Sequence, residues 1–370
     1  MDDRDSAPAV AEEIPTKTGL WRRHRRTILS GGVALAVVIG VFALVLPRIA
    51  DYRDVWGVVK TLSWPQILAL AGAVLLNLAT YAPPWMVALP GLRLRQAFVI
   101  TQASTASTYI APGGAAPGVA VSFAMLRGWH FDSGAVALAV TVVGVWNQLA
   151  ILGFPIIALG LLTGVGESNP LLETVALIGV AVFVAAVGGL AAGLSSDRLA
   201  LKVGHLAARI VNRLLRLIHR GPVAWNGQSL VRFRHRTIGL LKRRWHLLTL
   251  ATLAGQLTVF GVLLVSLRVL DVPASEVSLI EAFAAWSVMR IIGSLPITPG
   301  GLGVVELGLT SLLVGFGGGQ AQVVAAVLVY RVLTIVPTLV LGLLAAATWK
   351  RLNPGLGEQE AEPTQRVMET

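Results

Sequence analysis

Ala111-Pro112-Gly113-Gly114-Ala115, in the first half of the chain, nearly recurs in the second half as Thr298-Pro299-Gly300-Gly301-Leu302, and both copies lie within apolar sequence. Proline removes a backbone donor and glycine adopts conformations that other residues resist, so each copy is expected to interrupt a helix. Inside hydrocarbon such a break is stable only where protein or a water-filled cavity satisfies the freed backbone groups. The matched pair therefore predicts a central, functional cavity where two broken helices meet.

The composition is that of a polytopic membrane protein. Hydrophobic residues make up 55% of the chain and charged residues 13%, and the mean hydropathy is +0.73. The chain has no cysteine, which excludes disulfides, thiolate metal sites and a cysteine nucleophile. Its six histidines all lie in predicted loops or interfacial segments, so we expect neither a metal nor a cofactor.

We predict an all-α polytopic membrane protein with about eight hydrophobic segments. Six of them approach or exceed the roughly 20 residues that a bilayer-spanning helix needs. These six are 28–46, 65–89, 133–163, 171–194, 247–267 and 321–349. Two further stretches, 97–126 and 279–316, are cut by the Pro-Gly-Gly breaks into arms of about 12 to 18 residues, which is short for a full span. Re-entrant hairpins are therefore expected, with fully spanning broken helices as the alternative.

Lysine and arginine placement gives the orientation, because these residues concentrate on the cytoplasmic side. The basic segments, including 22–26 and 198–244, fall on one side when the N-terminus is cytoplasmic. We expect a polar and basic cytoplasmic tail over 1–26, one transmembrane domain over 27–352 and a disordered cytoplasmic tail over 353–370. The protein would be a multi-pass protein of the cytoplasmic membrane.

This orientation makes the two halves inverted repeats. The first hairpin would enter from the cytoplasm and the second from outside, and each precedes a long helix with an internal proline, Pro155 or Pro337. Such repeats are typical of secondary transporters, whose sites lie near the bilayer midplane. Chance similarity is the alternative, because alanine, valine, leucine and glycine dominate the chain.

Arg331 lies near the middle of the last predicted span, where an unpaired arginine costs about 2.5 kcal/mol or more. It needs a partner, and Glu306, Glu281 and Arg290 are the charges available around the second break. One interpretation is a structural ion pair that fixes helix packing. The other is an anion site for a lipid phosphate.

The glycines after each break favour an anion, because the first amide groups and positive dipole end of a short helix would point into the cavity. Uncharged polar residues in the first half make the two half-sites unequal, so the first hairpin is interpreted as a gate and the second as the headgroup site. The predicted headgroup-binding residues are Pro112, Gly113, Gly114, Pro299, Gly300, Gly301, Gly303, Glu306, Arg331, Arg290, Glu281, Gln102, Tyr109 and Asn147.

A second informative region, 195–246, holds twelve lysines and arginines and one aspartate. Part of this charge falls on one helical stripe, which predicts an amphipathic interfacial helix facing anionic lipids. The stripe comprises Lys202, Arg209, Arg213, Arg216 and Arg220. Nucleic-acid binding is not expected of a tether between two spans. A topology signal is the simplest alternative.

The string Leu-Pro-Ile-Thr-Pro-Gly-Gly-Leu-Gly-Val-Val-Glu (295–306), with Tyr330-Arg331, Pro337 and the earlier Pro112-Gly113-Gly114-Ala115, resembles the lysylphosphatidylglycerol synthase transmembrane, or flippase-like, family. The resemblance covers most of the chain and implies an integral inner-membrane domain proposed to move lipids between leaflets. In the best-known members this domain is fused to a soluble domain that transfers lysine from charged tRNA to phosphatidylglycerol. We expect that aminoacyl-transferase domain to be absent here, and the resemblance indicates no particular lipid.

The leading functional hypothesis is a flippase-like protein that translocates or binds a phospholipid or lipid-linked headgroup, with membrane lipids as partners. The second is a non-transporting scaffold or regulator of a cell-envelope enzyme, and a homo-oligomer is compatible with both. The third is a membrane glycosyltransferase-like enzyme using Asp51 and Asp54 in the first outer loop. Arg48 and Arg53 beside them favour loop salt bridges, and no catalytic motif is present, so an enzyme is not expected.

Overall fold

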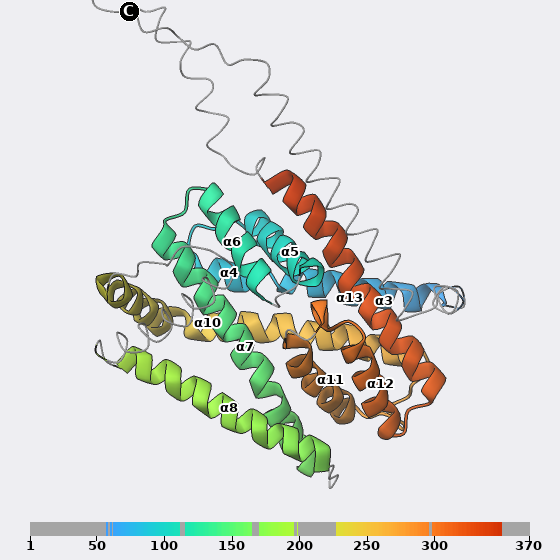
Figure 1. The fold of residues 1–370 in the computed structure, drawn as a ribbon. Helices are drawn as coiled ribbons and strands as arrows, with labels where there is room; N and C mark the ends of the chain where they lie inside the picture. Colours follow the sequence, from blue (N-terminus) through green and yellow to red (C-terminus); the bar gives the residue numbers. More distant parts are fainter. Residues whose placement is uncertain are drawn as a thin grey trace, which may run out of the picture.

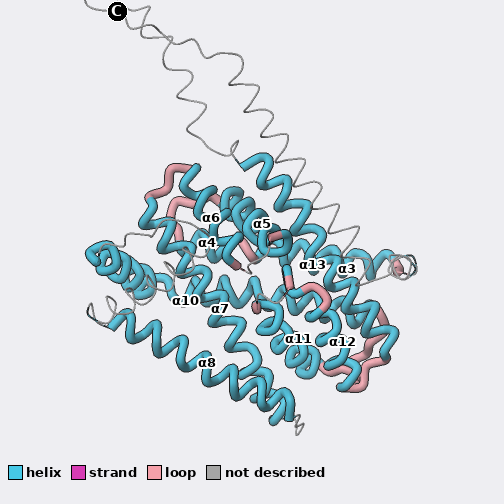
Figure 2. The backbone as a smooth tube through the Cα atoms, in the orientation of Figure 1, coloured by secondary structure: helices cyan, strands magenta, loops and turns pink. Residues whose placement is uncertain are grey.

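The computed structural model describes residues 62–111, 115–164, 170–195, 227–295 and 298–349, together with Gly57, Lys60 and Arg198. These residues form helices joined by short loops, with no strand among them (Figures 1 and 2). Five helical segments are long and apolar enough to cross a membrane: Trp64–Ala88, Ser133–Thr163, Leu177–Ser195, Arg232–Val269 and Gln320–Thr348. The chain is therefore all-helical where described, as a multi-pass membrane protein should be. The sixth predicted span, 28–46, lies outside the described residues.

The first described span is interrupted near its end. α3 (Trp64–Thr80) stops and α4 (Pro83–Ala88) begins within the stretch that was predicted as one span, 65–89. Pro83 and Pro84 carry no backbone N–H, so the helical ladder cannot pass through them unbroken. The interruption brings Tyr81 to the wall of a central cavity.

Three long helices agree with the predicted spans to within a few residues. They are α7 (Ser133–Gly164), α8 (Pro170–Ser195) and α13 (Gln320–Thr348). Each of these segments was recognisable because a long, predominantly apolar run has few alternatives to a membrane helix.

α10 (Gly227–Val269) joins the last part of the basic segment predicted at 195–246 to the span predicted at 247–267 in one helix. The described basic residues from 232 onward belong to the same continuous helix as the span. Its 43 residues measure about 65 Å, roughly twice the thickness of the hydrocarbon core. Leu240 and Leu241 of this extension pack in one cluster with Leu138 and Val142 of α7. That packing explains why the helix does not end at the basic residues.

The two Pro-Gly-Gly motifs each separate a pair of short helices, as predicted. The first hairpin consists of α5 (Leu94–Ile110) and α6 (Ala116–Gly128), with 17 and 13 residues. The second consists of α11 (Leu279–Ser294), the single turn η3 (Pro299–Gly301) and α12 (Val304–Gly315), whose two α-helices have 16 and 12 residues. All four arms fall short of the roughly 20 residues of a full span. Within each hairpin the two arms pack against each other.

One end of the helix bundle carries the base of the first hairpin. Trp129, directly after α6, donates through Nε1 to the carbonyl oxygen of Trp349 at the end of α13, at 3.0 Å. Asp132, directly before α7, pairs with Arg236 of α10 at 3.0 Å. The backbone N–H of Ala135 and the Arg236 guanidinium together hold the pKa of Asp132 below its ordinary value.

The opposite end carries the base of the second hairpin. Gln66 at the start of α3 donates to the carbonyl oxygen of Val269 at the end of α10, at 3.1 Å. Arg268 of α10 donates through Nη2 to the carbonyl oxygen of Val277, just before α11, at 2.8 Å. The two hairpins therefore enter the bundle from opposite ends (Figure 1).

Each hairpin packs on the long helix of the other half of the chain: α5 lies against α13, and α11 lies against α7. At the first crossing a Cβ on Gly342 would lie 2.3 Å from Ala106 Cβ and 2.6 Å from the carbonyl oxygen of Gln102, so only glycine fits. At the second crossing Phe154 of α7 contacts the rings of Phe283 and Trp286 of α11. This reciprocal packing brings the tips of both hairpins to the middle of the bundle.

Candidate functional site

A cavity of about 370 Å³ lies between the two hairpins and is lined by residues of α3, α4, α5, α6, α7, α10, α11, α12 and α13. Its size is within the range of ligand-binding pockets. The uncharged polar lining includes Tyr81, Gln102, Thr105, Tyr109, Asn147 and Gln256. Among the described residues, the charged lining consists of two arginines, Arg290 and Arg331. The predicted central cavity is therefore present, and polar side chains form part of its lining.

The tips of the two hairpins touch at Tyr109 and Gly300. A Cβ on Gly300 would lie 2.0 Å from Cδ1 of the Tyr109 ring, so the ring lies directly on the glycine backbone. Gly300, Gly301 and Gly303 have φ values of 62°, 68° and 81°, a left-handed conformation that favours glycine at all three positions. The second motif therefore needs its glycines for the turn itself and for the close approach of the first hairpin.

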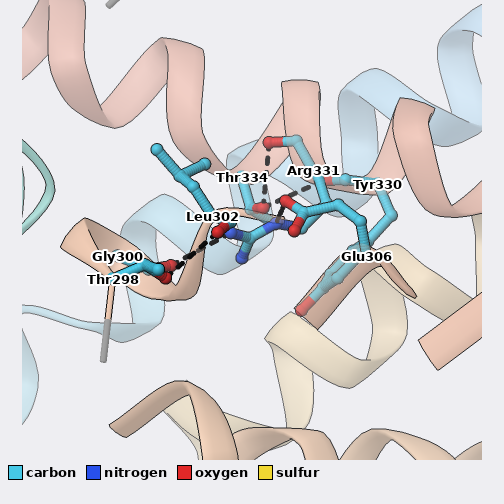
Figure 3. A network of polar contacts seen from close by, with 7 residues as sticks. All are labelled: Thr298, Gly300, Leu302, Glu306, Tyr330, Arg331 and Thr334. Carbon is cyan, nitrogen blue, oxygen red and sulfur yellow. Dashed lines mark hydrogen bonds and ion pairs between the residues drawn. The ribbon is translucent and has the colours of Figure 1, made fainter. Parts of the chain in front are cut away.

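Arg331 fastens the second hairpin to α13. Its Nε donates to Glu306 Oε1 at 2.5 Å, and its Nη2 donates to the carbonyl oxygen of Gly300 at 3.0 Å (Figure 3). The two charged side chains are 9% and 7% exposed. The pairing of Arg331 with Glu306, expected from the cost of an isolated buried charge, is thus present. One guanidinium holds both the tip turn and the first turn of α12.

Arg290 has a different environment. Its Nη2 donates to Gln256 Oε1 at 2.6 Å, and Gln256 in turn donates to Asn147 Oδ1, so a polar chain links α11, α10 and α7. Its Cζ lies 5.8 Å from the centre of the Trp286 ring, within cation–π distance. The buried Nε has no hydrogen-bond partner. No carboxylate among the described residues lies within ion-pairing distance of Arg290.

The structure brings most of the described headgroup candidates together around this cavity. Those that line it are Gln102, Tyr109, Asn147, Arg290, Gly300 and Arg331. Glu306 contacts the cavity wall through Arg331, and Gly301 and Gly303 form the adjoining turn with Pro299. Pro112, Gly113 and Gly114 lie outside the described residues, as do Lys202, Arg209, Arg213, Arg216 and Arg220 of the basic stripe and Asp51 and Asp54 of the outer loop.

Glu281, predicted as a headgroup residue, is not among the residues that line the cavity. It lies in the first turn of α11, where its Oε2 accepts from the backbone N–H of Ser278 at 2.7 Å and its own N–H donates to Ser278 Oγ at 3.2 Å. This reciprocal pair is a capping box. The spacing Ser278-x-x-Glu281 ahead of an apolar run was the sequence signal for it.

Gln256 and Tyr81 are cavity residues that sequence reasoning missed. Gln256 is 1% exposed and joins Arg290 to Asn147 at the centre of the polar chain. A glutamine in the middle of an uncharged span is costly in lipid, and that cost was the available signal. Tyr81 was missed for another reason, because only the interruption between α3 and α4 brings it to the cavity wall.

A comparison with protein families identifies the family of the chain. The model of the lysylphosphatidylglycerol synthase TM region matches residues 32–342. The chain belongs to this family. The matched region contains both Pro-Gly-Gly motifs, the cavity and the Arg331–Glu306 pair. The match confirms the resemblance noted in the sequence. No curated protein matches the chain by sequence.

The cavity of this lysylphosphatidylglycerol synthase TM protein provides two guanidinium groups, several amides and several hydroxyls. Guanidinium groups match phosphate and carboxylate geometry, and amides and hydroxyls bind polar headgroup atoms as donors or acceptors. The arrangement can therefore bind a polar or anionic group inside an apolar bundle.

Proposed function

We propose that the protein is a flippase-like transporter that moves a phospholipid or lipid-linked headgroup across the cytoplasmic membrane. The observation that carries the proposal is the cavity between two hairpins that enter from opposite ends of the bundle and touch at Tyr109 and Gly300. Amide, hydroxyl and guanidinium groups form part of its lining. A headgroup needs such a polar path, because moving polar groups through hydrocarbon is costly. The membership of the family is consistent with this role.

The finer topology is part of the same proposal. We infer six spanning helices and two re-entrant hairpins arranged as an inverted repeat, with both termini in the cytoplasm. The reciprocal packing of α5 on α13 and α11 on α7 supports the repeat. Because the chain has no cysteine, single introduced cysteines test the orientation. Arg127→Cys should react with a membrane-impermeant thiol reagent only from the cytoplasmic side, and Ser275→Cys only from outside.

The mechanism follows from the contacts between the hairpins. A headgroup that enters the cavity would exchange water for amide, hydroxyl and guanidinium partners while the acyl chains stay in lipid. The Tyr109–Gly300 contact would separate the two halves of the path, and its opening would pass the headgroup from one side to the other. Alternating access of this kind requires one repeat to move against the other.

Reconstitution into vesicles with fluorescently labelled phospholipids tests the proposal. A membrane-impermeant quencher measures the fraction of labelled lipid that reaches the outer leaflet. Wild type should translocate the labelled lipid faster than protein-free vesicles do. Thr105 lines the cavity, so the larger side chain of Thr105→Phe would occupy cavity space and should abolish the acceleration. Leu75→Phe is the matched control, because Leu75 is 66% exposed on the outer face of α3.

The outcomes separate the remaining functions. Equal rates for wild type, Thr105→Phe and protein-free vesicles would exclude transport of the labelled lipid. Co-purification of one stoichiometric cell-envelope enzyme, with no lipid movement, would favour the scaffold. An Asp51-dependent product from a polyprenyl-phosphate sugar would favour the enzyme.

A further inference from the structure

The charges around the cavity do not balance. Two arginines line it, whereas the one carboxylate paired with either of them in the described part of the chain, Glu306, is bonded to Arg331. An uncompensated charge inside an apolar bundle is costly unless water or a counter-ion neutralises it. The second positive charge, on Arg290, therefore has no protein counter-ion among the described residues.

The surroundings of Arg290 hold this guanidinium in place without neutralising it. The Gln256–Asn147 pair fixes one nitrogen through a neutral amide, and Trp286 supports the group at cation–π distance. The side chains of Tyr81, Tyr330 and Tyr109 lie close enough to interact with it, and they contribute hydroxyl groups rather than carboxylates. The neutral partners orient the guanidinium and leave its charge available.

Unused hydrogen-bonding capacity lies in the same cavity. Arg290 Nε is buried without a partner, and so is the Oε1 atom of Gln102, a side chain on the opposite hairpin that is 3% exposed. Buried polar groups are nearly always satisfied, so unsatisfied ones within one cavity indicate a missing ligand or water. Because Gln102 carries amide donors as well, its flipped rotamer can donate to an anion.

Arg331 does not offer the same capacity. Its Nε and Nη2 are both occupied by the second hairpin, and its charge is compensated by Glu306 at 2.5 Å. A ligand that displaced Glu306 would leave a buried carboxylate unpaired, which is strongly unfavourable. An anion therefore has a lower cost of binding at Arg290 than at Arg331.

We propose that the cavity binds the phosphoryl group of an anionic lipid, and that Arg290 provides the charge that selects it. This inference rests on the proposed function in one respect, namely that the cavity is the headgroup site. It names the class of cargo: a headgroup with net negative charge, such as a phosphate monoester, is favoured over a zwitterionic one. Gln256 and Asn147 act as positioning residues that hold the guanidinium, and Gln102 contributes a contact from the first hairpin.

Calorimetric titration of the full chain in a neutral detergent tests the selectivity. The probes are dihexanoylphosphatidate, dihexanoylphosphatidylcholine and inorganic phosphate. Wild type should bind phosphatidate about tenfold or more tightly than phosphatidylcholine, and Arg290→Gln should remove that preference. Arg290→Lys keeps the charge and should keep the preference. Arg236→Gln, which removes an exposed arginine at the end of the bundle, is the matched control and should bind as wild type does.

The phosphate arm identifies the source of the ligand. Competition by inorganic phosphate would support a site that takes the phosphoryl group itself, and binding of phosphatidate alone would support a site that also needs the lipid. Equal wild-type affinity for phosphatidate and phosphatidylcholine would overturn the inference, whether or not the variants fold. So would a folded Arg290→Gln protein that keeps the preference.

The two proposals can fail separately. Arg290-dependent binding without lipid movement in vesicles would leave this inference standing and refute transport. Lipid movement with no preference for the anionic headgroup would do the reverse.

Discussion

The Arg331–Glu306 pair allows a quantitative test of how the second hairpin is held. Replacing Arg331 by Met removes both the 2.5 Å bond to Glu306 and the 3.0 Å bond to the Gly300 carbonyl, while keeping a long side chain. It also leaves the Glu306 carboxylate, whose side chain is 7% exposed, without its counter-charge. Glu306 Oε2 already has no hydrogen-bond partner, so neighbouring groups do not compensate for the loss.

The magnitude follows from this burial. Breaking one side of a buried ion pair costs about 3–5 kcal/mol, because an uncompensated charge remains. Arg331→Met should therefore lower the free energy of unfolding by about that amount. Removing both charges, in Arg331→Met with Glu306→Gln, leaves no orphaned charge and loses mainly the bond to Gly300, which is worth about 1.5–3 kcal/mol for a charged donor. The double variant should be more stable than the Arg331→Met single.

The assay is unfolding of the purified protein in mixed micelles, followed by tryptophan fluorescence and helical circular dichroism. A double-mutant cycle over wild type, both singles and the double gives the coupling energy, expected at about 1–3 kcal/mol. Arg236→Met serves as the control, because it breaks an exposed pair and should leave the unfolding midpoint nearly unchanged. Additive effects, with Arg331→Met no more harmful than this control, would refute the assignment of the pair as the fastening of the second hairpin.

Two further predictions concern helix packing and an exposed carboxylate. Gly342→Ala should lower the free energy of unfolding by about 1–3 kcal/mol, because the new Cβ would lie 2.6 Å from a backbone oxygen of α5. Gly261→Ala is the control: nothing lies within 4 Å of its Cβ, so it should not destabilise α10. Asp132→Asn should reduce the thermal unfolding midpoint slightly at neutral pH, and the difference from wild type should vanish in acid. The sign follows because the pKa of Asp132 is lowered in the folded protein, so its contribution is present above the ordinary carboxyl pKa of about 4 and is lost as the pH falls through the lowered value. The measurement is the thermal unfolding midpoint of both proteins from pH 7 to pH 3. A difference in midpoint between wild type and Asp132→Asn that grew as the pH fell would contradict this prediction.

The long spans were predictable because they depend on one physical requirement. A predominantly apolar run of sufficient length in a chain of this hydropathy must satisfy its own backbone, and a helix does so. α7 and α8 therefore begin and end within a few residues of the predicted limits. The start of α10 was not predictable in the same way, because its basic residues are also typical of an interfacial segment. The packing of Leu240 and Leu241 beside α7, which continues the helix, depends on tertiary contacts.

The hairpins illustrate what a local motif can and cannot predict. Pro-Gly-Gly fixes where a helix breaks, because the missing donor and the left-handed glycines act locally. The contact between Tyr109 and Gly300, which are far apart in the sequence, depends on how both hairpins cross the long helices. The sequence supported a meeting of the two breaks through the symmetry of the halves, and it did not identify the residues in contact.

For the charged residues, the sequence indicates that a buried charge needs a partner, but it does not always identify that partner. A buried arginine requires compensation, so a partner for Arg331 could be sought in the sequence, and Glu306 is that partner. Glu281 was assigned to the same group by its position, although its spacing from Ser278 fits a helix cap that consumes its oxygens locally. Once Glu281 is committed there and Glu306 to Arg331, Arg290 is left facing the cavity with amides and phenols. The unpaired positive charge of Arg290 thus results from the pairing of Glu306 with Arg331 and of Glu281 with Ser278. The proposed ligand class therefore depends on the three-dimensional arrangement and not on the net charge of the segment.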